Sequence, residues 1–151
     1  MLNNNFDYIN RLIAFGIFLL TFVVYFDTMA PTVSYWDCGE FIAVSHTLGV
    51  PHPPGSPFFL LLGRIFSMLP FNEDIAFRVN IISPIVSALA VMLLYLSTVK
   101  VVTHWRGKVN SLSDCLIVFG GGVAGALAFA FTDSHWFNAV EAEVYAFSTF
   151  F

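Results

Sequence analysis

Two acidic residues in the first third of the chain have types and spacing suited to acid–base chemistry. Residues 35–43 read Tyr-Trp-Asp-Cys-Gly-Glu-Phe-Ile-Ala, so Asp37 and Glu40 are three positions apart and would share one face of a helix. Trp36 and Phe41 place apolar material beside them, and apolar surroundings raise the pKa of a carboxylate. Such a carboxylate could serve as a general base. The same spacing also suits helix capping, with Asp37 at the helix start and Glu40 in its first turn, and the two roles are compatible.

A histidine follows in a proline-rich turn. His52 lies between Pro51 and Pro53, which hold it extended and outside any helix. A rigid imidazole at this point could hydrogen-bond a phosphate or a carboxylate, or it could be an ordinary surface histidine of the turn. His46 is about 180° from Asp37 on an ideal helix, and we therefore do not place it in the same site.

Two arginines lie close to apolar segments. Arg64 stands in the run Leu-Gly-Arg-Ile-Phe, where an arginine either extends its guanidinium to lipid headgroups or binds a phosphate. Arg78 lies at the start of a long apolar stretch and is better explained as an anchor at the membrane interface.

Further acids and a histidine lie near the end of the sequence. Glu141 and Glu143 are two residues apart, about 200° on a helix, so at most one of them should face the same cleft as Asp37. Asp133, His135 and the two glutamates could form a divalent-metal site with Asp37, but their spacing is specific to no metal.

The composition indicates the kind of protein that must position these residues. Of 151 residues, 58% are hydrophobic and only 11% are charged, against about 25% charged in a typical soluble domain. The net charge of −4 leaves no basic patch for nucleic acid. Cys38 and Cys115, far apart, define neither a disulfide framework nor a zinc site. The sequence therefore predicts an all-α integral membrane protein.

Three windows almost free of charge predict transmembrane helices at about residues 12–30, 79–99 and 115–132, since a span needs roughly 20 apolar residues. A cleavable signal peptide is the alternative for the first window, and the sparse basic region and the lack of a clean cleavage site count against it. Small residues at 121 and 125, and at 122 and 126, would let the third helix pack closely against another.

A fourth uncharged window, residues 41–63, contains four prolines and therefore cannot be one continuous helix. We predict instead two short helices at the membrane interface, at about residues 37–48 and 56–69, joined by the proline-rich turn. Both belong to an outer loop at residues 31–78, and a second outer loop begins at residue 133.

Basic residues predict the orientation. Arg11 precedes the first span, and Lys100, Arg106 and Lys108 lie at the end of the second, so both regions should be cytoplasmic. The outer loops are then extracytoplasmic. All the acids except Asp7 and Asp114 fall on that side.

The order of these motifs resembles the GT-C superfamily of membrane glycosyltransferases. Protein O-mannosyltransferases of that superfamily carry Asp-Glu followed by His-Pro-Pro-Leu; here Asp37 and Glu40 are separated, and Gly55 replaces the leucine. The longer strings at residues 31–41, 51–57 and 139–145 resemble the branch related to transmembrane protein 260, common in Bacteroidetes-type bacteria. The resemblance covers about residues 12–151.

This resemblance implies the N-terminal part of a GT-C-like domain of a longer protein, in a bacterial inner membrane with residues 31–78 periplasmic. It implies transfer, with inversion, of a mannose-like sugar from a polyprenyl-phosphate donor to a protein hydroxyl or a glycan. Lipid would be a further partner, no cofactor is certain, and a divalent metal stays open. The implied catalytic residues are Asp37 and Glu40; His52 and Arg64 would lie near the donor phosphate, with Glu141 and Glu143 among the substrate-binding candidates. The alternative is a non-catalytic membrane subunit or a transporter fragment, and the uncharged spans count against a transporter.

Overall fold

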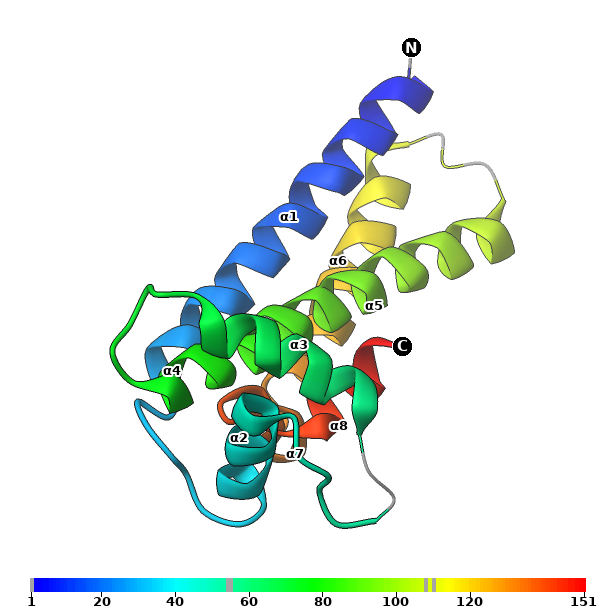
Figure 1. Cartoon of the computed structure of the whole chain (residues 1–151). Helices are drawn as coiled ribbons and strands as arrows, with labels where there is room; N and C mark the ends of the chain where they lie inside the picture. Colours follow the sequence, from blue (N-terminus) through cyan, green and yellow to red (C-terminus); the bar gives the residue numbers. More distant parts are fainter. Residues whose placement is uncertain (1, 54–55, 108, 110) are drawn as a thin grey trace.

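The computed structural model describes residues 2–53, 56–107, 109 and 111–151, and these residues form helices and connecting loops without a strand. Pro54 and Gly55 of the proline-rich turn and the basic residue Lys108 lie outside the described residues. The helices, in chain order and as labelled in Figure 1, are α1 (Leu2–Thr28), α2 (Cys38–Thr47), α3 (Pro57–Met68), α4 (Ile75–Asn80), α5 (Ile82–Arg106), α6 (Leu112–Ala130), α7 (Asp133–Ala139) and α8 (Val144–Phe150).

Three helical stretches, Asn5–Thr28, Ile75–Arg106 and Leu112–Ala130, are long and apolar enough to cross a membrane. They confirm the all-α class and the three predicted spans. All three stretches begin before the predicted windows, and the second also ends after its window, because polar residues at a membrane surface can continue a helix beyond its apolar segment.

Helix α5 is the centre of the bundle and packs against α1, α6, α7 and α8. Its apolar window is 61% buried, compared with 22% for α1 and for α6. A stripe of α6 faces α5 and is fully buried at Val118, Ala126 and Ala130. On the same stripe a side chain at Gly122 would lie 3.0 Å from Val99 and 3.1 Å from Tyr95, so glycine allows the close approach.

A second apolar cluster joins α2, α3 and α4 to α8 at one end of the bundle (Figure 1). Phe41 of α2, Phe59 of α3 and Phe147 of α8 are its aromatic members. The two helices predicted at residues 37–48 and 56–69 are confirmed as α2 and α3. Helix α3 begins at Pro57, where the missing amide hydrogen costs nothing because the first turn of a helix lacks intrahelical partners.

Candidate active site

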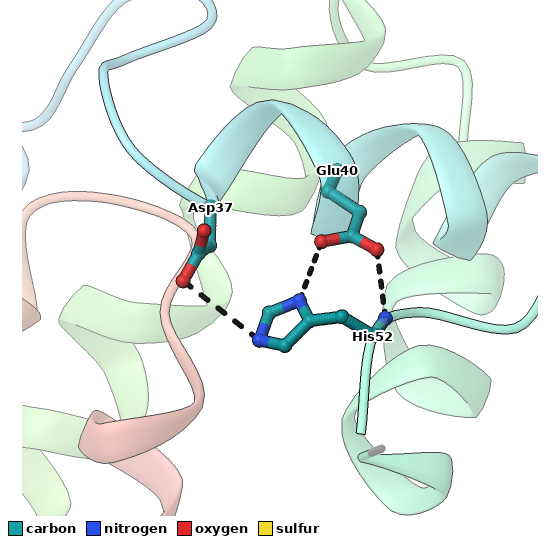
Figure 2. A group of neighbouring side chains, drawn as sticks. All are labelled: Asp37, Glu40 and His52. Carbon is teal, nitrogen blue, oxygen red and sulfur yellow. Dashed lines mark hydrogen bonds and ion pairs between the residues drawn. The ribbon is translucent and has the colours of Figure 1, made fainter. Parts of the chain in front are cut away.

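The structure brings Asp37, Glu40 and His52 together at the start of α2 (Figure 2). His52 Nδ1 lies 2.6 Å from Glu40 Oε2, and the backbone amide of His52 donates to Glu40 Oε1 at 2.8 Å. The other ring nitrogen, Nε2, points toward Asp37 and lies 4.0 Å from its Oδ2. Of the two contacts considered for this imidazole, the structure therefore contains the one with a carboxylate.

The backbone after α2 explains how His52 returns to the start of that helix. Leu48 ends α2 in the left-handed conformation with φ 53°, and the amide of Gly49 donates to the carbonyl of Val44. The chain reverses at this point and runs back alongside α2. Pro51 is buried, and His52 lies at a bend outside any helix, between two prolines.

The contact with His52 favours the ionised form of the Glu40 carboxyl. Its hydrogen bonds with His52 lower the pKa of the Glu40 carboxyl, and the same contact raises the pKa of the His52 imidazole. Our expectation of a raised pKa at Glu40 was therefore wrong. Trp36 is 85% exposed and supplies no apolar environment, whereas His52 donates directly to the carboxylate.

Capping does not occupy the carboxylate of Asp37. Asp37 precedes α2 as its N-cap residue, but its side chain accepts no capping hydrogen bond. The side chain is 59% exposed and is thus open to a substrate, unlike Glu40, whose two oxygens both contact His52.

A cavity of about 290 Å³ opens in front of this group. Its walls are Asp37, Phe41, His52, Ser56, Glu143, Val144, Tyr145 and Ser148. Glu143 is 6% exposed, and burial raises the pKa of its carboxyl, with further contributions from the carboxylates of Glu141 and Asp37. The sequence predicts a carboxyl whose pKa is raised by apolar surroundings, and this carboxyl is that of Glu143 and not that of Glu40.

Glu141 lies outside the wall of this cavity. One of its carboxylate oxygens accepts a hydrogen bond from the hydroxyl of Ser34, and the other is buried with no hydrogen-bond partner among the described residues. The prediction that Glu141 and Glu143 face different directions assumed that both residues lie on one helix. Residues 140–143 form a connection between α7 and α8 and not a helix.

Asn80, which sequence reasoning missed, holds the loop before Asp37. Its side-chain amide donates to the carbonyls of Ala30 and Thr32, each at 2.9 Å, and its oxygen lies 3.7 Å from the thiol of Cys38. The amide of Ala30 also donates to the carbonyl of Val140 at 2.8 Å. The loop is thereby tied both to α4 and to the segment that carries Glu143. The signal in the sequence was a polar residue inside a long apolar window.

The remaining candidates are not part of this group. The Arg64 guanidinium donates to the carbonyl of His46 at the far end of α2, about 9 Å along the helix axis from Glu40. His135 is buried against the ring of Phe129, with ring centroids 4.3 Å apart. The metal site considered for Asp133 and His135 together with Asp37 is not formed among the described residues. Among the described residues, the metal-ligating side chains that gather are Asp37, Glu40 and His52, whose ligand atoms lie within 4.8 Å of one another.

Comparison with known proteins gives one family. Residues 37–151 match the family described as the Protein O-mannosyl-transferase TMEM260 N-terminal domain. The chain is 32% identical over 138 residues to Protein O-mannosyl-transferase tmem260 of Dictyostelium discoideum, covering 89% of this chain and 15% of that protein. It is 30% identical over 137 residues to Protein O-mannosyl-transferase TMEM260 of Mus musculus, covering 90% and 17%. The chain thus spans less than a fifth of the length of these relatives. No solved structure matches it.

Proposed function

The chain belongs to the family of TMEM260 N-terminal domains, and from this premise we propose that it carries the acid–base site of a protein O-mannosyltransferase. The donor would be a mannose-like sugar on a polyprenyl phosphate, and the acceptor a protein hydroxyl, with a glycan hydroxyl as the alternative. The observation that carries the proposal is the different environment of the two acids, Asp37 and Glu40. Glu40 is occupied by His52, whereas Asp37 is exposed beside the cavity.

In this mechanism Asp37 is the general base. It accepts the proton of the acceptor hydroxyl while the hydroxyl oxygen attacks the anomeric carbon from the side opposite the phosphate. The bond between the anomeric carbon and the phosphate oxygen breaks, and the polyprenyl phosphate leaves with the electron pair. One bond forms as one breaks, which inverts the anomeric configuration. Glu143, in the wall of the same cavity, would bind the sugar.

His52 and Glu40 act together on the leaving group. Glu40 fixes the ring through Nδ1 and leaves Nε2 directed into the space shared with Asp37. Because Glu40 raises the pKa of His52, the imidazole holds its proton more readily and would donate a hydrogen bond to the departing phosphate. Glu40 is thus a positioning residue. Arg64, at the other end of α2, is assigned to the phosphate only by resemblance to the family.

A divalent cation is an alternative to the protonated imidazole in the same group, because a ring nitrogen that binds a cation carries no proton. Carboxylate oxygens and one imidazole nitrogen suit Mg²⁺, Mn²⁺ or Zn²⁺, and the ligand atoms of Asp37, Glu40 and His52 are close enough to share an ion. When bound, the ion would supply positive charge next to the donor phosphate. Titration of the metal-stripped protein with Mn²⁺, followed by electron paramagnetic resonance, tests this; binding unchanged by Asp37→Asn would contradict it.

Replacement of Asp37 tests the central assignment. A general base contributes about 100- to 10,000-fold to a rate, so Asp37→Asn in the full-length protein should lower kcat for mannose transfer by that factor. Asp133→Asn, an exposed acid outside the cavity, is the matched control and should leave kcat unchanged. Normal transfer by Asp37→Asn would exclude this carboxylate as the base. Absence of mannose transfer by the unsubstituted full-length protein would favour a non-catalytic membrane subunit.

We further propose that the site faces the extracytoplasmic side, which is the periplasm if the membrane is a bacterial inner membrane. The N-terminal half of α1 and the C-terminal end of α5 lie at the opposite end of the bundle from α2 and α8 (Figure 1). The first of these segments contains Arg11, and the second contains Lys100 and Arg106. Labelling of intact cells with a membrane-impermeant maleimide tests this in a Cys115→Ser background, since Cys38 is buried. Tyr35→Cys should react and Trp105→Cys should not, although the native side chains are 85% and 89% exposed. The reverse pattern would invert the topology.

A further inference from the structure

A polar cavity lies between the N-terminal half of α1 and the C-terminal end of α5, at the end of the bundle opposite α2 and α8 (Figure 1). Its volume is about 480 Å³, which is a usual size for a ligand-binding pocket. None of its wall residues belongs to the candidate active site, so the cavity needs an explanation of its own. The walls consist of Phe6, Asp7 and Asn10 of α1 and of Leu96, Val99, Lys100, Thr103 and His104 of α5.

The two walls of this cavity carry opposite charges that do not pair with each other. Asp7 and Lys100 are both exposed, and the ion pairs among the described residues include neither of them. His104, one turn beyond Lys100 on the same face of α5, adds an imidazole N–H that can donate to an anionic group. A carboxylate on one wall and an ammonium on the other give a zwitterionic ligand a partner for each of its charges. The cavity therefore suits a zwitterion better than a simple anion.

Two buried oxygens in the walls have no hydrogen-bond partner among the described residues. They are Oδ1 of Asn10 and Oγ1 of Thr103. The amide oxygen can only accept a hydrogen bond, and the hydroxyl oxygen can also accept one. Because an unpaired buried polar atom is unfavourable, a ligand that brings hydrogen-bond donors would be favoured here. A primary ammonium group brings three donors, whereas a quaternary ammonium group brings none.

The position of the cavity along α5 indicates a lipid and not a water-soluble zwitterion. Residues 79–99 contain no charged side chain, and Lys100 is the first charged residue that follows them. A lysine at such a border extends its ammonium group to the level of the lipid headgroups. Leu96, also in the wall, lies one turn deeper in the apolar segment. The wall thus changes from polar to apolar in the order in which a phospholipid changes from headgroup to acyl chain.

We propose that this cavity binds the headgroup of a phospholipid with a primary amine, of the phosphatidylethanolamine class, in the leaflet opposite the acidic cavity. The phosphate oxygens would accept hydrogen bonds from Lys100 and His104. The ammonium group would donate to the carboxylate of Asp7 and to the oxygens of Asn10 and Thr103. Sugar transfer takes no part in this binding, so the inference is independent of the proposed function and each can fail without the other.

The test compares phosphatidylethanolamine with phosphatidylcholine of the same acyl chains, whose nitrogen carries three methyl groups in place of the three hydrogens. Native mass spectrometry of the full-length protein in detergent measures the dissociation constant for the first bound molecule of each lipid. Hydrogen bonds from the ammonium group to the cavity should favour phosphatidylethanolamine roughly tenfold. Equal affinities of the unsubstituted protein for the two lipids would overturn the proposal. The cavity would then be filled by another segment of the protein or by lipid bound without regard to its headgroup.

Substitutions on the two walls locate the preference. Asp7→Ala should bring the two dissociation constants together, because it removes the partner of the ammonium group. Lys100→Gln should weaken both lipids by a similar factor of roughly ten, since both carry the same phosphate, and Lys100→Arg should restore binding. Asp133→Ala is the matched control, because Asp133 is an exposed acid at the start of α7, outside this cavity, and its loss should leave the preference intact. A preference that persists in Asp7→Ala, or that disappears equally in Asp133→Ala, overturns the assignment.

Discussion

Asn80 fastens the loop that carries Asp37 to the body of the bundle, and its replacement by alanine tests how the candidate site is held in place. The side chain is fully buried and donates both amide hydrogens, one to the carbonyl of Ala30 and one to that of Thr32. Alanine keeps the helix but removes both donors. The two carbonyls then lose the partner that fixes the path of the loop between α1 and α2.

The magnitude follows from the two hydrogen bonds, each 2.9 Å long. A net contribution of about 0.5–1.5 kcal/mol for each bond gives a loss of about 1–3 kcal/mol in the free energy of unfolding for Asn80→Ala. The 3.7 Å contact with the Cys38 thiol is long and weak and adds little. Because Ala30 also bonds to Val140, the loop should loosen without detaching.

The assay is unfolding in mixed micelles of mild detergent and dodecyl sulfate, combined with hydrogen–deuterium exchange of residues 29–37. Asn138→Ala is the matched control, because the Asn138 amide donates at 2.7 Å to the carbonyl of Ser134 within α7, and a local bond of this kind is worth at most about 0.5 kcal/mol. Exchange in residues 29–37 should speed up in Asn80→Ala alone. Equal stability losses in the two variants, with unchanged exchange in the loop, would refute the argument that Asn80 holds the site.

Two other substitutions test the contacts around α2. Glu40→Gln removes the carboxylate that stabilises the imidazolium, so the pKa of His52 should fall toward its ordinary value in a carbon-13 histidine titration by nuclear magnetic resonance; an unchanged pKa would show that Glu40 is not its partner. Gly63→Ala places a methyl group 2.8 Å from Ser45 Cβ and forces α2 and α3 apart, which should cost about 1–3 kcal/mol of stability in the mixed-micelle assay. Gly16→Ala, with no atom within 4 Å, should not destabilise, and a similar loss at both glycines would contradict the close packing of α2 on α3.

The carboxylate of Asp37 is exposed, whereas that of Glu40 is hydrogen-bonded to His52. The two acids differ in their hydrogen-bond partners and not in their distance from apolar residues. Both acids lie at the start of α2, and both were expected to sit against Trp36 and Phe41. Trp36 turns outward, and Phe41 packs into the core with Phe59. What distinguishes Glu40 from Asp37 is a histidine that returns from twelve residues further along the chain.

The sequence alone was sufficient for the membrane class, the three long apolar helices and the two short helices between the first and the second of them. These features depend on local quantities: the length of an uncharged run, and the prolines that interrupt residues 41–63. The two prolines that flank His52 also predicted that it lies outside a helix. No knowledge of distant contacts was needed for any of them.

Only the tertiary structure decided which of the candidate residues meet. Glu143 reaches the cavity of Asp37 because Ala30 bonds to Val140 and so aligns two segments more than a hundred residues apart. Arg64 binds the end of α2 and not the acidic group, although it lies only twelve residues beyond His52. Burial and the pKa of a side chain depend on neighbours brought together by the packing of whole helices, and spacing along a single helix does not contain that information.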